Sequence, residues 1–263
     1  MNTEHVVKSY SDYREEDRFS TDNARKVEFL TSIRAVEENI NPQANILDPA
    51  AGTGAYAFYL NDKGHSVTAL DITPRHIELI NENKGNRDIK AFVNDARDLS
   101  MFEDNSFDAV LCMGPLYHLT ELSDRKKCLN ECKRVLKTGG LLISAYINRF
   151  FVIPQIVLQD RKFIDADIIK QLRESGSMRS DDEFCFWTDT YFAAPEDMES
   201  IYSEMGLNIV DHIAADGVSI FIKNTINAMN ADEFKIWCDY HYSTCREKSM
   251  LGISNHGLVF GRK

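Results

Sequence analysis

Residues 44–71 read ANILDPAAGTGAYAFYLNDKGHSVTALD. The apolar segment 44–49 predicts a short β-strand, and the glycine-containing segment 50–54 predicts a tight turn that leads into a helix at 55–60. The run 66–71 predicts a second strand. Glycines in such a turn let a ligand approach the backbone and leave the first amides of the helix facing it. The stretch therefore predicts a strand–turn–helix–strand unit with a ligand-binding turn.

The same alternation continues to residue 147. The strands read as near-continuous apolar runs, which indicates a parallel sheet covered by helices on both faces. We therefore predict an α/β fold with a doubly wound, mostly parallel sheet. Its further elements up to that point are a helix at 74–83, strands at 89–95 and 107–113, a helix from Ser123 or Asp124 to Lys137, and a strand at 141–147.

The regular alternation stops after residue 147 and resumes near residue 195. We predict four parts: an N-terminal helical lid at 1–43, the cofactor-binding core at 44–147, a helical and aromatic cap insertion over the acceptor site at 148–194, and the C-terminal part of the core at 195–263. The lid region includes a helix at 24–40. The last part contains a helix at 195–205, a strand at 207–212, a helical region at 220–248 and a final strand at 257–261.

Composition narrows the function classes. The chain has 263 residues with 30 Lys and Arg against 41 Asp and Glu, a net charge of -11. Such a surface repels phosphate backbones and anionic membranes, so a nucleic-acid partner is disfavoured, although a local basic groove is not excluded. The N-terminus has no apolar signal-peptide core, and no apolar stretch is long enough to cross a bilayer.

The six cysteines show neither a C-x-x-C pair nor a zinc spacing. Cys128 and Cys132 share one face of a predicted helix with apolar residues and are interpreted as small core residues. We therefore expect no metal, and a reducing, cytoplasmic location.

Two carboxylates indicate which ligand the turn binds. Asp71 ends the second strand about 20 residues after the turn, where a carboxylate accepts the hydroxyls of a ribose. Asp48 ends the first strand, where a pyrophosphate-binding fold avoids negative charge. It therefore suits a nucleoside cofactor that carries an ammonium group and no phosphates, such as S-adenosylmethionine. Gly52, Gly54 and Ala57 satisfy a dinucleotide fingerprint loosely, so a nicotinamide-dependent oxidoreductase is the alternative that Asp48 argues against.

At these residues the sequence resembles the class I S-adenosylmethionine-dependent methyltransferases. The resemblance covers roughly residues 20–147 and implies a Rossmann-like, seven-stranded sheet whose final strand lies antiparallel beside strand five. The motifs that carry it are ILDPAAGTG at 46–54, VTALD at 67–71, VNDARDL at 93–99, FDAVLCMGPLYHL at 107–119 and CKRVLKTGGLLIS at 132–144.

The resemblance also implies positions for the cofactor, S-adenosyl-L-methionine, and its product S-adenosyl-L-homocysteine. Asp48 and the turn glycines would contact the methionine end, Asp71 the ribose, and Met113 would lie beside the sulfonium. Tyr13 and Arg18 in the N-terminal segment would close on the cofactor, or are simply solvated. The full predicted cofactor set is Asp48, Ala50, Gly52, Gly54, Asp71, Ile72, Asp95, Ala96, Met113, Tyr13 and Arg18.

The acceptor side departs from the nucleic-acid amino-methylases, which carry Asn/Asp-Pro-Pro-Tyr where this chain has Gly114-Pro115-Leu116-Tyr117. Gly114 has no side chain to hold an amino group, which argues against DNA or RNA as the acceptor. His118 is the candidate general base, because its ordinary pKa lies near neutrality, or it packs against the following helix. Tyr117 would orient the acceptor or simply form part of the pocket wall. The candidate acceptor-binding residues are Tyr146, Arg149, Trp187 and Tyr191; His256 would point into the cleft or make a structural hydrogen bond.

The sequence thus predicts a methyltransferase that acts on a small molecule by direct displacement, as a monomer or homodimer. An RNA or protein methyltransferase, and a non-catalytic protein that binds S-adenosylmethionine, remain alternatives.

Overall fold

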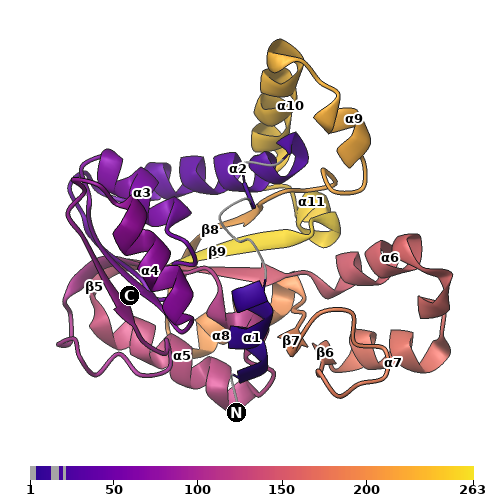
Figure 1. Cartoon of the computed structure of the whole chain (residues 1–263), viewed down its shortest axis with the longest axis horizontal. Coiled ribbons are helices and arrows are strands. Elements are labelled where there is room, and N and C mark those ends of the chain that lie inside the picture. The colour runs from indigo at the N-terminus through magenta and orange to yellow at the C-terminus, as the bar shows by residue number, and fades with distance from the viewer. Residues whose placement is uncertain (1–3, 13–17, 20–21) are drawn as a thin grey trace.

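The computed structural model describes residues 4–12, 18–19 and 22–263 (Figure 1). Its centre is a seven-stranded sheet in the order β3-β2-β1-β4-β5-β9-β8. The strands are β1 (Asn45–Asp48), β2 (Ser66–Asp71), β3 (Ile89–Val93), β4 (Phe107–Cys112), β5 (Leu136–Ile147), β8 (Asn208–Ala214) and β9 (His256–Arg262).

The pairing within the sheet confirms the predicted fold class. β1 to β5 are parallel to one another, whereas β9 pairs antiparallel with both β5 and β8. The final strand thus lies beside strand five, as the resemblance implied. Antiparallel pairing sets His256, the first residue of β9, opposite Ile147, the last residue of β5. This register brings the start of β9 to the edge where the parallel strands end.

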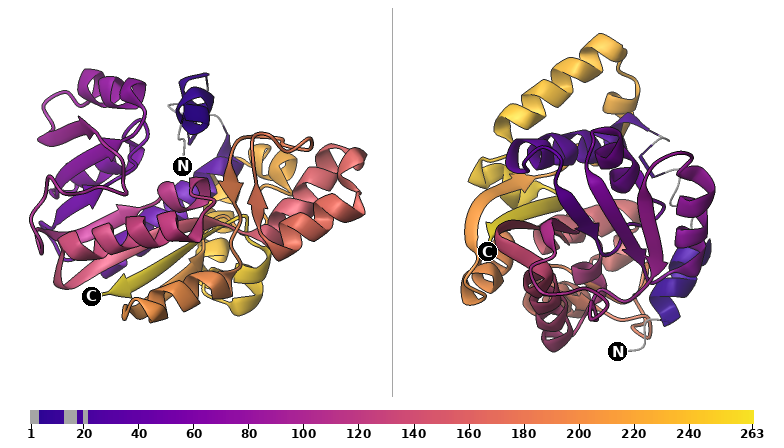
Figure 2. Two further views of the ribbon diagram at one scale, coloured as in Figure 1. Left: turned by 90° about the horizontal axis from the view of Figure 1, so that it is seen from below. Right: turned by 90° about the vertical axis from the view of Figure 1, so that its left-hand side faces the viewer.

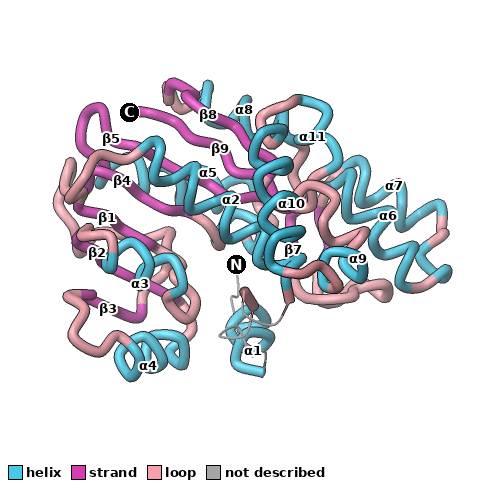
Figure 3. The backbone as a smooth tube through the Cα atoms, turned by 90° about the horizontal axis from the view of Figure 1, so that it is seen from above, coloured by secondary structure: helices cyan, strands magenta, loops and turns pink. Residues whose placement is uncertain are grey.

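Helices cover both faces of the sheet (Figures 2 and 3). Successive strand residues point to opposite faces, so Ile46 joins one core cluster and Leu47 the other. The first cluster includes side chains from α2 (Asn23–Asn39), α3 (Ala55–Asp62) and α4 (Pro74–Asn83). The second includes side chains from α5 (Leu122–Val135) and α8 (Pro195–Glu204).

Two groups of elements extend beyond the carboxyl edge of the sheet (Figure 1). The first follows β5 and comprises α6 (Arg149–Gln159), a short 3₁₀ helix (Arg161–Phe163), α7 (Ala166–Glu174) and the hairpin of β6 (Ser177–Met178) and β7 (Thr190–Tyr191). The second lies between β8 and β9 and comprises α9 (Lys223–Asn227), α10 (Ala231–Thr244) and α11 (Lys248–Ile253).

Several boundaries differ from the sequence expectation. β5 begins at Leu136 rather than at 141, because Leu136 already pairs with Phe107 before a register shift in β4. Within the predicted N-terminal lid, α2 packs its buried face against the core of the sheet. The part of this segment that lies over the sheet edge is therefore α1 (Glu4–Asp12) with residues 18–19. In the part of the chain that is described, no helix has both the length and the apolarity to cross a membrane.

Candidate active site

A cavity of about 360 Å³ opens where β1, β2 and β4 end. Carboxylates, the glycine turn and the backbone after β4 line it, together with Val6, Tyr10 and Arg18 from the N-terminal segment. The sequence-predicted residues that line this cavity are Asp48, Ala50, Gly52, Asp71, Ile72, Asp95, Ala96, Met113, Arg18, Tyr117 and His118. Tyr13 lies outside the described residues.

The glycine turn adopts the conformation that its sequence predicts. Gly52 and Gly54 have φ values of 54° and 93°, in the left-handed region that residues with a Cβ rarely adopt. Gly54 precedes α3 and does not itself line the cavity; a Cβ there would lie 3.0 Å from Cγ1 of Ile80. Gly54 therefore shapes the turn, and Gly52 is the glycine that faces the cavity.

Asp71 connects the turn to the end of β2. Its Oδ2 accepts a hydrogen bond from the Gly52 amide at 2.9 Å, and its Oδ1 accepts one from the Thr73 amide at 2.8 Å. Each carboxylate oxygen has a second lone pair. Since Asp71 is 7% exposed and lines the cavity, those lone pairs are placed to accept two hydroxyl groups of a bound ligand.

His76 is a site residue that the sequence reading missed. It lies in the first turn of α4, is 4% exposed and lines the cavity. Neither ring nitrogen has a hydrogen-bond partner among the described residues, although Nδ1 lies 3.2 Å from Oδ1 of Asp71. Buried polar groups normally have partners, so this ring points to a polar ligand beside Asp71. The signal in the sequence was a histidine five residues after the acidic strand end.

Asp48 is almost fully buried at the floor of the cavity, with 3% of its surface exposed. Burial raises the pKa of its carboxyl to about 8, and the nearby Asp71 adds to this rise, although the Ala50 amide opposes it. Burial is the dominant cause because a carboxylate charge without a cationic partner is poorly solvated there. A ligand with an ammonium group would supply that partner.

Asp95 lies at the other end of the cavity and is anchored by a residue that the sequence reading did not select. Its Oδ2 accepts a hydrogen bond from Nη2 of Arg97 at 2.6 Å, and Arg97 also pairs with Asp124 at 3.2 Å. Burial opposes ionisation, but the hydrogen bonds from Arg97 outweigh it and lower the pKa of Asp95. Asp95 therefore presents a fixed carboxylate next to the Ala96 backbone.

A second cavity, of about 850 Å³, adjoins the first. One wall is apolar and comes from α6 and the segment before β7, with Val152, Ile156 and Trp187 among its residues. Residues 220–225 before and within α9 form another wall. Five residues line both cavities and thus form a shared wall, which we call the junction: Tyr10, Arg18, Glu28, Tyr117 and His256.

Of the four residues predicted to bind the acceptor, one lines the second cavity and three line neither cavity. Trp187 lines the second cavity, whereas Tyr146, Arg149 and Tyr191 line neither. Tyr146 points to the opposite face of the sheet from Ile147, where its hydroxyl lies 2.9 Å from Nε2 of His212. The strand alternation and the missing side chain of Gly257, whose Cβ would lie 2.2 Å from the Tyr146 ring, explain this position.

Arg149 and Tyr191 are engaged in structural contacts outside the cavities. Arg149 forms an ion pair with Asp197 at 2.5 Å and donates a hydrogen bond to the Phe192 carbonyl oxygen at 3.2 Å. The Tyr191 ring lies under the guanidinium of Arg125, 3.5 Å from Cζ to the ring centroid. Both residues therefore join the insertion to α8 and α5.

His118 lies in the first cavity with both ring nitrogens engaged. Nδ1 is 3.2 Å from the Asp189 carbonyl oxygen, which can only accept, so Nδ1 carries the proton. Nε2 is 3.0 Å from the Tyr10 hydroxyl and accepts its hydrogen bond. Burial lowers the pKa of His118 to about 4, which outweighs the Asp189 carbonyl. His118 is therefore neutral at physiological pH, with its lone pair already taken by Tyr10.

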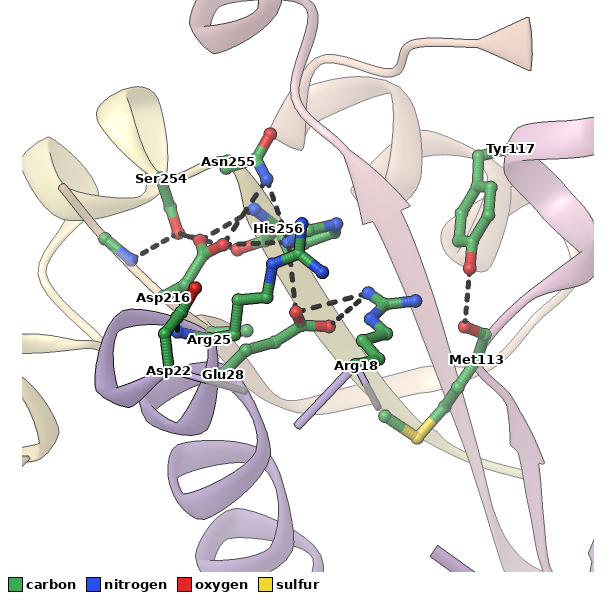
Figure 4. Close-up of polar contacts among 12 residues, drawn as sticks. Arg18, Asp22, Arg25, Glu28, Met113, Tyr117, Asp216, Ser254, Asn255 and His256 are labelled. Atoms are coloured by element: carbon green, nitrogen blue, oxygen red, sulfur yellow. Dashed lines mark hydrogen bonds and ion pairs between the residues drawn. The ribbon is translucent and has the colours of Figure 1, made fainter. Parts of the chain in front are cut away.

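The junction contains charged groups that no single motif indicated (Figure 4). Arg18 donates from Nη2 to both carboxylate oxygens of Glu28, at 2.8 and 3.2 Å. Nδ1 of His256 lies 2.8 Å from Oδ2 of Asp216 and 3.6 Å from Oε2 of Glu28. Glu28 comes from α2, Asp216 from the loop after β8 and His256 from β9, so only the fold brings them together.

A second cluster of possible ligand atoms lies away from both cavities. The sulfur atoms of Cys112, Cys128 and Cys132 lie within 4.8 Å of one another, and all three residues are fully buried in the second core cluster. None of them lines either cavity. Their packing agrees with the interpretation of Cys128 and Cys132 as core residues.

Comparison with known proteins connects this geometry to a family. Residues 47–144 match the family model described as "Methyltransferase domain". Over 152 residues the chain is 34% identical to the glycine/sarcosine N-methyltransferase of Parasynechococcus marenigrum, covering 56% of this chain and 53% of that protein. Over 106 residues it is 37% identical to the demethylmenaquinone methyltransferase of Thermotoga maritima, covering 40% and 43%. The chain thus spans about half the length of these curated relatives.

Solved structures show the same fold. An S-adenosylmethionine-dependent methyltransferase from Methanosarcina mazei aligns with a TM-score of 0.59 at 20% identity, covering 87% of this chain and 96% of that one. An S-adenosylmethionine-dependent methyltransferase from Mesorhizobium loti aligns with a TM-score of 0.57 at 13% identity, covering 90% and 100%. At these identities the likeness establishes the arrangement of the sheet and helices.

Proposed function

We propose that this chain is a class I S-adenosylmethionine-dependent methyltransferase and that it methylates a small molecule; the match of residues 47–144 to a methyltransferase domain, the curated relatives and the shared fold support this. The observation that carries the proposal is the pair of adjoining cavities with a shared wall. The first has the groups that the cofactor needs, and the second has room for an acceptor. A non-catalytic binding protein would not need the second.

The residues of the first cavity fit S-adenosylmethionine by their chemistry. Buried Asp48 would take the ammonium group, Asp71 and His76 would take the ribose hydroxyls, and Asp95 with Ala96 would flank the adenine. The N-terminal residues Tyr10 and Arg18 line the cavity from above, so they would exclude water from the reacting groups. When bound, the cofactor supplies a methyl group on a positively charged sulfur.

The chain contributes mainly by alignment. The backbone at Met113, which follows β4, lines the first cavity, and the Tyr117 hydroxyl lies 3.4 Å from the Met113 carbonyl oxygen. Gly114 lets the backbone after β4 lie close to the glycine turn, because a Cβ there would lie 3.0 Å from the Cβ of Ala50. Holding two reactants in line accounts for up to roughly 7–11 kcal/mol of barrier reduction in well-oriented systems.

Three features support a small-molecule acceptor. The second cavity is walled by the insertion and by the segment before α9. The net charge of -11 disfavours a nucleic-acid substrate. The curated relatives named above are methyltransferases of glycine and sarcosine and of demethylmenaquinone.

With no disulfide among its six cysteines, we also place the protein in the cytoplasm.

The test is an acceptor screen that measures formation of S-adenosylhomocysteine. Purified protein is incubated with S-adenosylmethionine and panels of amines, phenols, thiols and carboxylic acids, with bulk tRNA and total protein extract as separate arms. Turnover of a small molecule supports the proposal. Turnover confined to the tRNA or protein arm overturns the small-molecule assignment, and no turnover in any arm, with the cofactor bound, favours a non-catalytic protein.

A further inference from the structure

The junction is where a transferred methyl group has to cross. A displacement needs the acceptor atom in the second cavity to face the methyl group in the first, and only a residue on the shared wall reaches both. His256 lines both cavities, whereas His118 lines the first alone. Among the described residues, His256 is the one imidazole at the junction.

The proton on His256 can be placed from its partners. Nδ1 is 2.8 Å from Oδ2 of Asp216, and a carboxylate can only accept, so Nδ1 carries a proton. The side-chain amide of Asn255 lies 3.1 Å from Nδ1 and 3.4 Å from the same carboxylate oxygen, so it donates toward Asp216. In the neutral ring, the lone pair is therefore on Nε2.

Asp216 is a fixed support for this ring. It is 1% exposed, and its Oδ1 accepts hydrogen bonds from the His256 amide and from the Ser254 hydroxyl, both at 2.9 Å. Burial opposes its ionisation, but the charge and hydrogen bonds of His256 outweigh this and lower the pKa of Asp216. Asp216 thus remains ionised, fixes the tautomer and can stabilise an imidazolium, as the carboxylate does in other histidine–aspartate pairs.

The charges around His256 favour its protonated form, so the ring can accept a proton from an acceptor. Burial disfavours the imidazolium, but the negative charges of Glu28 and Asp216 outweigh it and raise the pKa of His256, with Arg18 acting in the opposite sense. Arg25 from α2 lies beside this group in Figure 4, and Tyr117 stands across the junction. His118, by contrast, has a pKa of about 4 and a lone pair that accepts from Tyr10.

The same cluster has the ligand types of a divalent-cation site, because Glu28, Asp216 and His256 place one ligand atom each within 4.8 Å. Their existing partners favour acid–base chemistry instead. Both oxygens of Glu28 accept from Arg18, and the His256 nitrogen in question holds the proton shared with Asp216. A cation would have to displace both.

We propose that His256, positioned by Asp216, is the general base that deprotonates the methyl acceptor, and that the acceptor is an acidic hydroxyl of the phenol type. The inference rests on the proposed function. The acceptor O–H proton passes to Nε2 of His256 as the oxygen electron pair forms the new O–C bond. The C–S bond breaks with its electron pair going to sulfur, and the imidazolium later releases the proton to solvent. The aromatic wall at Phe186, Trp187 and Phe192 suits an aromatic acceptor body.

The first test needs no acceptor. We would record NMR spectra of ¹⁵N-histidine-labelled protein saturated with S-adenosylhomocysteine, across a pH titration, for the wild type, Asp216→Asn and His256→Gln. The proposal expects a His256 ring protonated at Nδ1, with a pKa above the ordinary 6.5 that falls by about one unit or more in Asp216→Asn. A neutral His256 ring that carries its proton on Nε2 would overturn the proposal. A change in the ¹⁵N chemical shift on addition of zinc or magnesium that shows Nδ1 binding the metal would overturn it as well.

The second test is kinetic and uses phenol and p-nitrophenol as acceptor probes. The rate should rise with pH through a pKa above 6.5 in the wild type, and this limb should move to lower pH in Asp216→Asn. His256→Gln should lower kcat by about 10²–10⁴-fold while S-adenosylhomocysteine affinity stays within about twofold. A limb near pH 4 would assign the base to His118 and overturn the proposal.

His212→Gln is the matched control, because His212 also pairs with a carboxylate, at 2.9 Å from Glu199, but lines neither cavity. It should leave both readouts unchanged. Transfer to amines but to neither phenol would overturn the acceptor class while leaving the proposed function intact. Failure to bind S-adenosylhomocysteine would instead overturn the proposed function.

Discussion

Replacing Asp48 with asparagine should reveal that cofactor binding is coupled to a proton. The free carboxyl has a pKa of about 8, so at pH 7 about nine in ten molecules carry the proton there. An ammonium group bound beside Asp48 favours the carboxylate, so binding has to release that proton. Affinity should therefore rise about tenfold per pH unit between pH 6 and pH 7 and level off above pH 8. At pH 7 the penalty relative to the plateau is about 1.4 kcal/mol.

The assay is calorimetric titration with S-adenosylhomocysteine in several buffers that differ in ionisation enthalpy. At pH 7 the wild type should release about 0.9 proton per molecule bound, and Asp48→Asn should bind more weakly and release none from this site. Asp95→Asn is the matched control, because the pKa of Asp95 is lowered and it stays ionised throughout. Its effect should not change with pH. Wild-type affinity that is flat from pH 6 to pH 8, without proton release, would refute the reasoning.

Three further predictions follow from the same contacts. Asp71→Ala should weaken S-adenosylhomocysteine binding by at least about tenfold, and it should also lower the melting temperature because the Gly52 and Thr73 amides lose their acceptor. Unchanged affinity in calorimetry, measured where the variant is folded, would remove Asp71 from the ribose site. Gly54→Ala should lower the unfolding free energy by about 1–3 kcal/mol in urea, because φ is 93° and the new Cβ would lie 3.0 Å from Ile80; a neutral result would contradict the strain argument. Without ligand, Asp48→Asn should have a higher urea midpoint than the wild type at pH 8 but not at pH 4. The raised pKa of the wild-type carboxyl lowers the free energy of unfolding as the pH rises from about 4 to 8, and asparagine has no such group. Equal midpoints at pH 8 would contradict the raised pKa.

The sheet and most residues that line the first cavity could be predicted because their signals are local. Apolar strand runs, the turn around Gly52 and Gly54 and the acidic strand ends at Asp48 and Asp71 are each contained in a few consecutive residues. The fold then places the ends of neighbouring parallel strands at one edge, which brings these groups together without further information.

The acceptor side could not be predicted in the same way. Its walls come from segments far apart in the chain. Tyr146 points to the opposite face of the sheet from its neighbour Ile147 and so lies outside both cavities. The sequence predicts Arg149 and Tyr191 as acceptor-binding residues, but their partners Asp197 and Arg125 come from α8 and α5 and follow only from the tertiary structure. His256 lies beside Asp216 because β8 and β9 pair antiparallel, a tertiary contact that no motif encodes.

The most direct test of the central claim is calorimetric titration of the unmodified protein with S-adenosylmethionine, with NAD as the control. The account predicts binding of S-adenosylmethionine in the micromolar range at pH 8, with no heat from NAD. Binding of NAD without S-adenosylmethionine would contradict the assignment of the cavity formed by Asp48, Asp71 and the glycine turn.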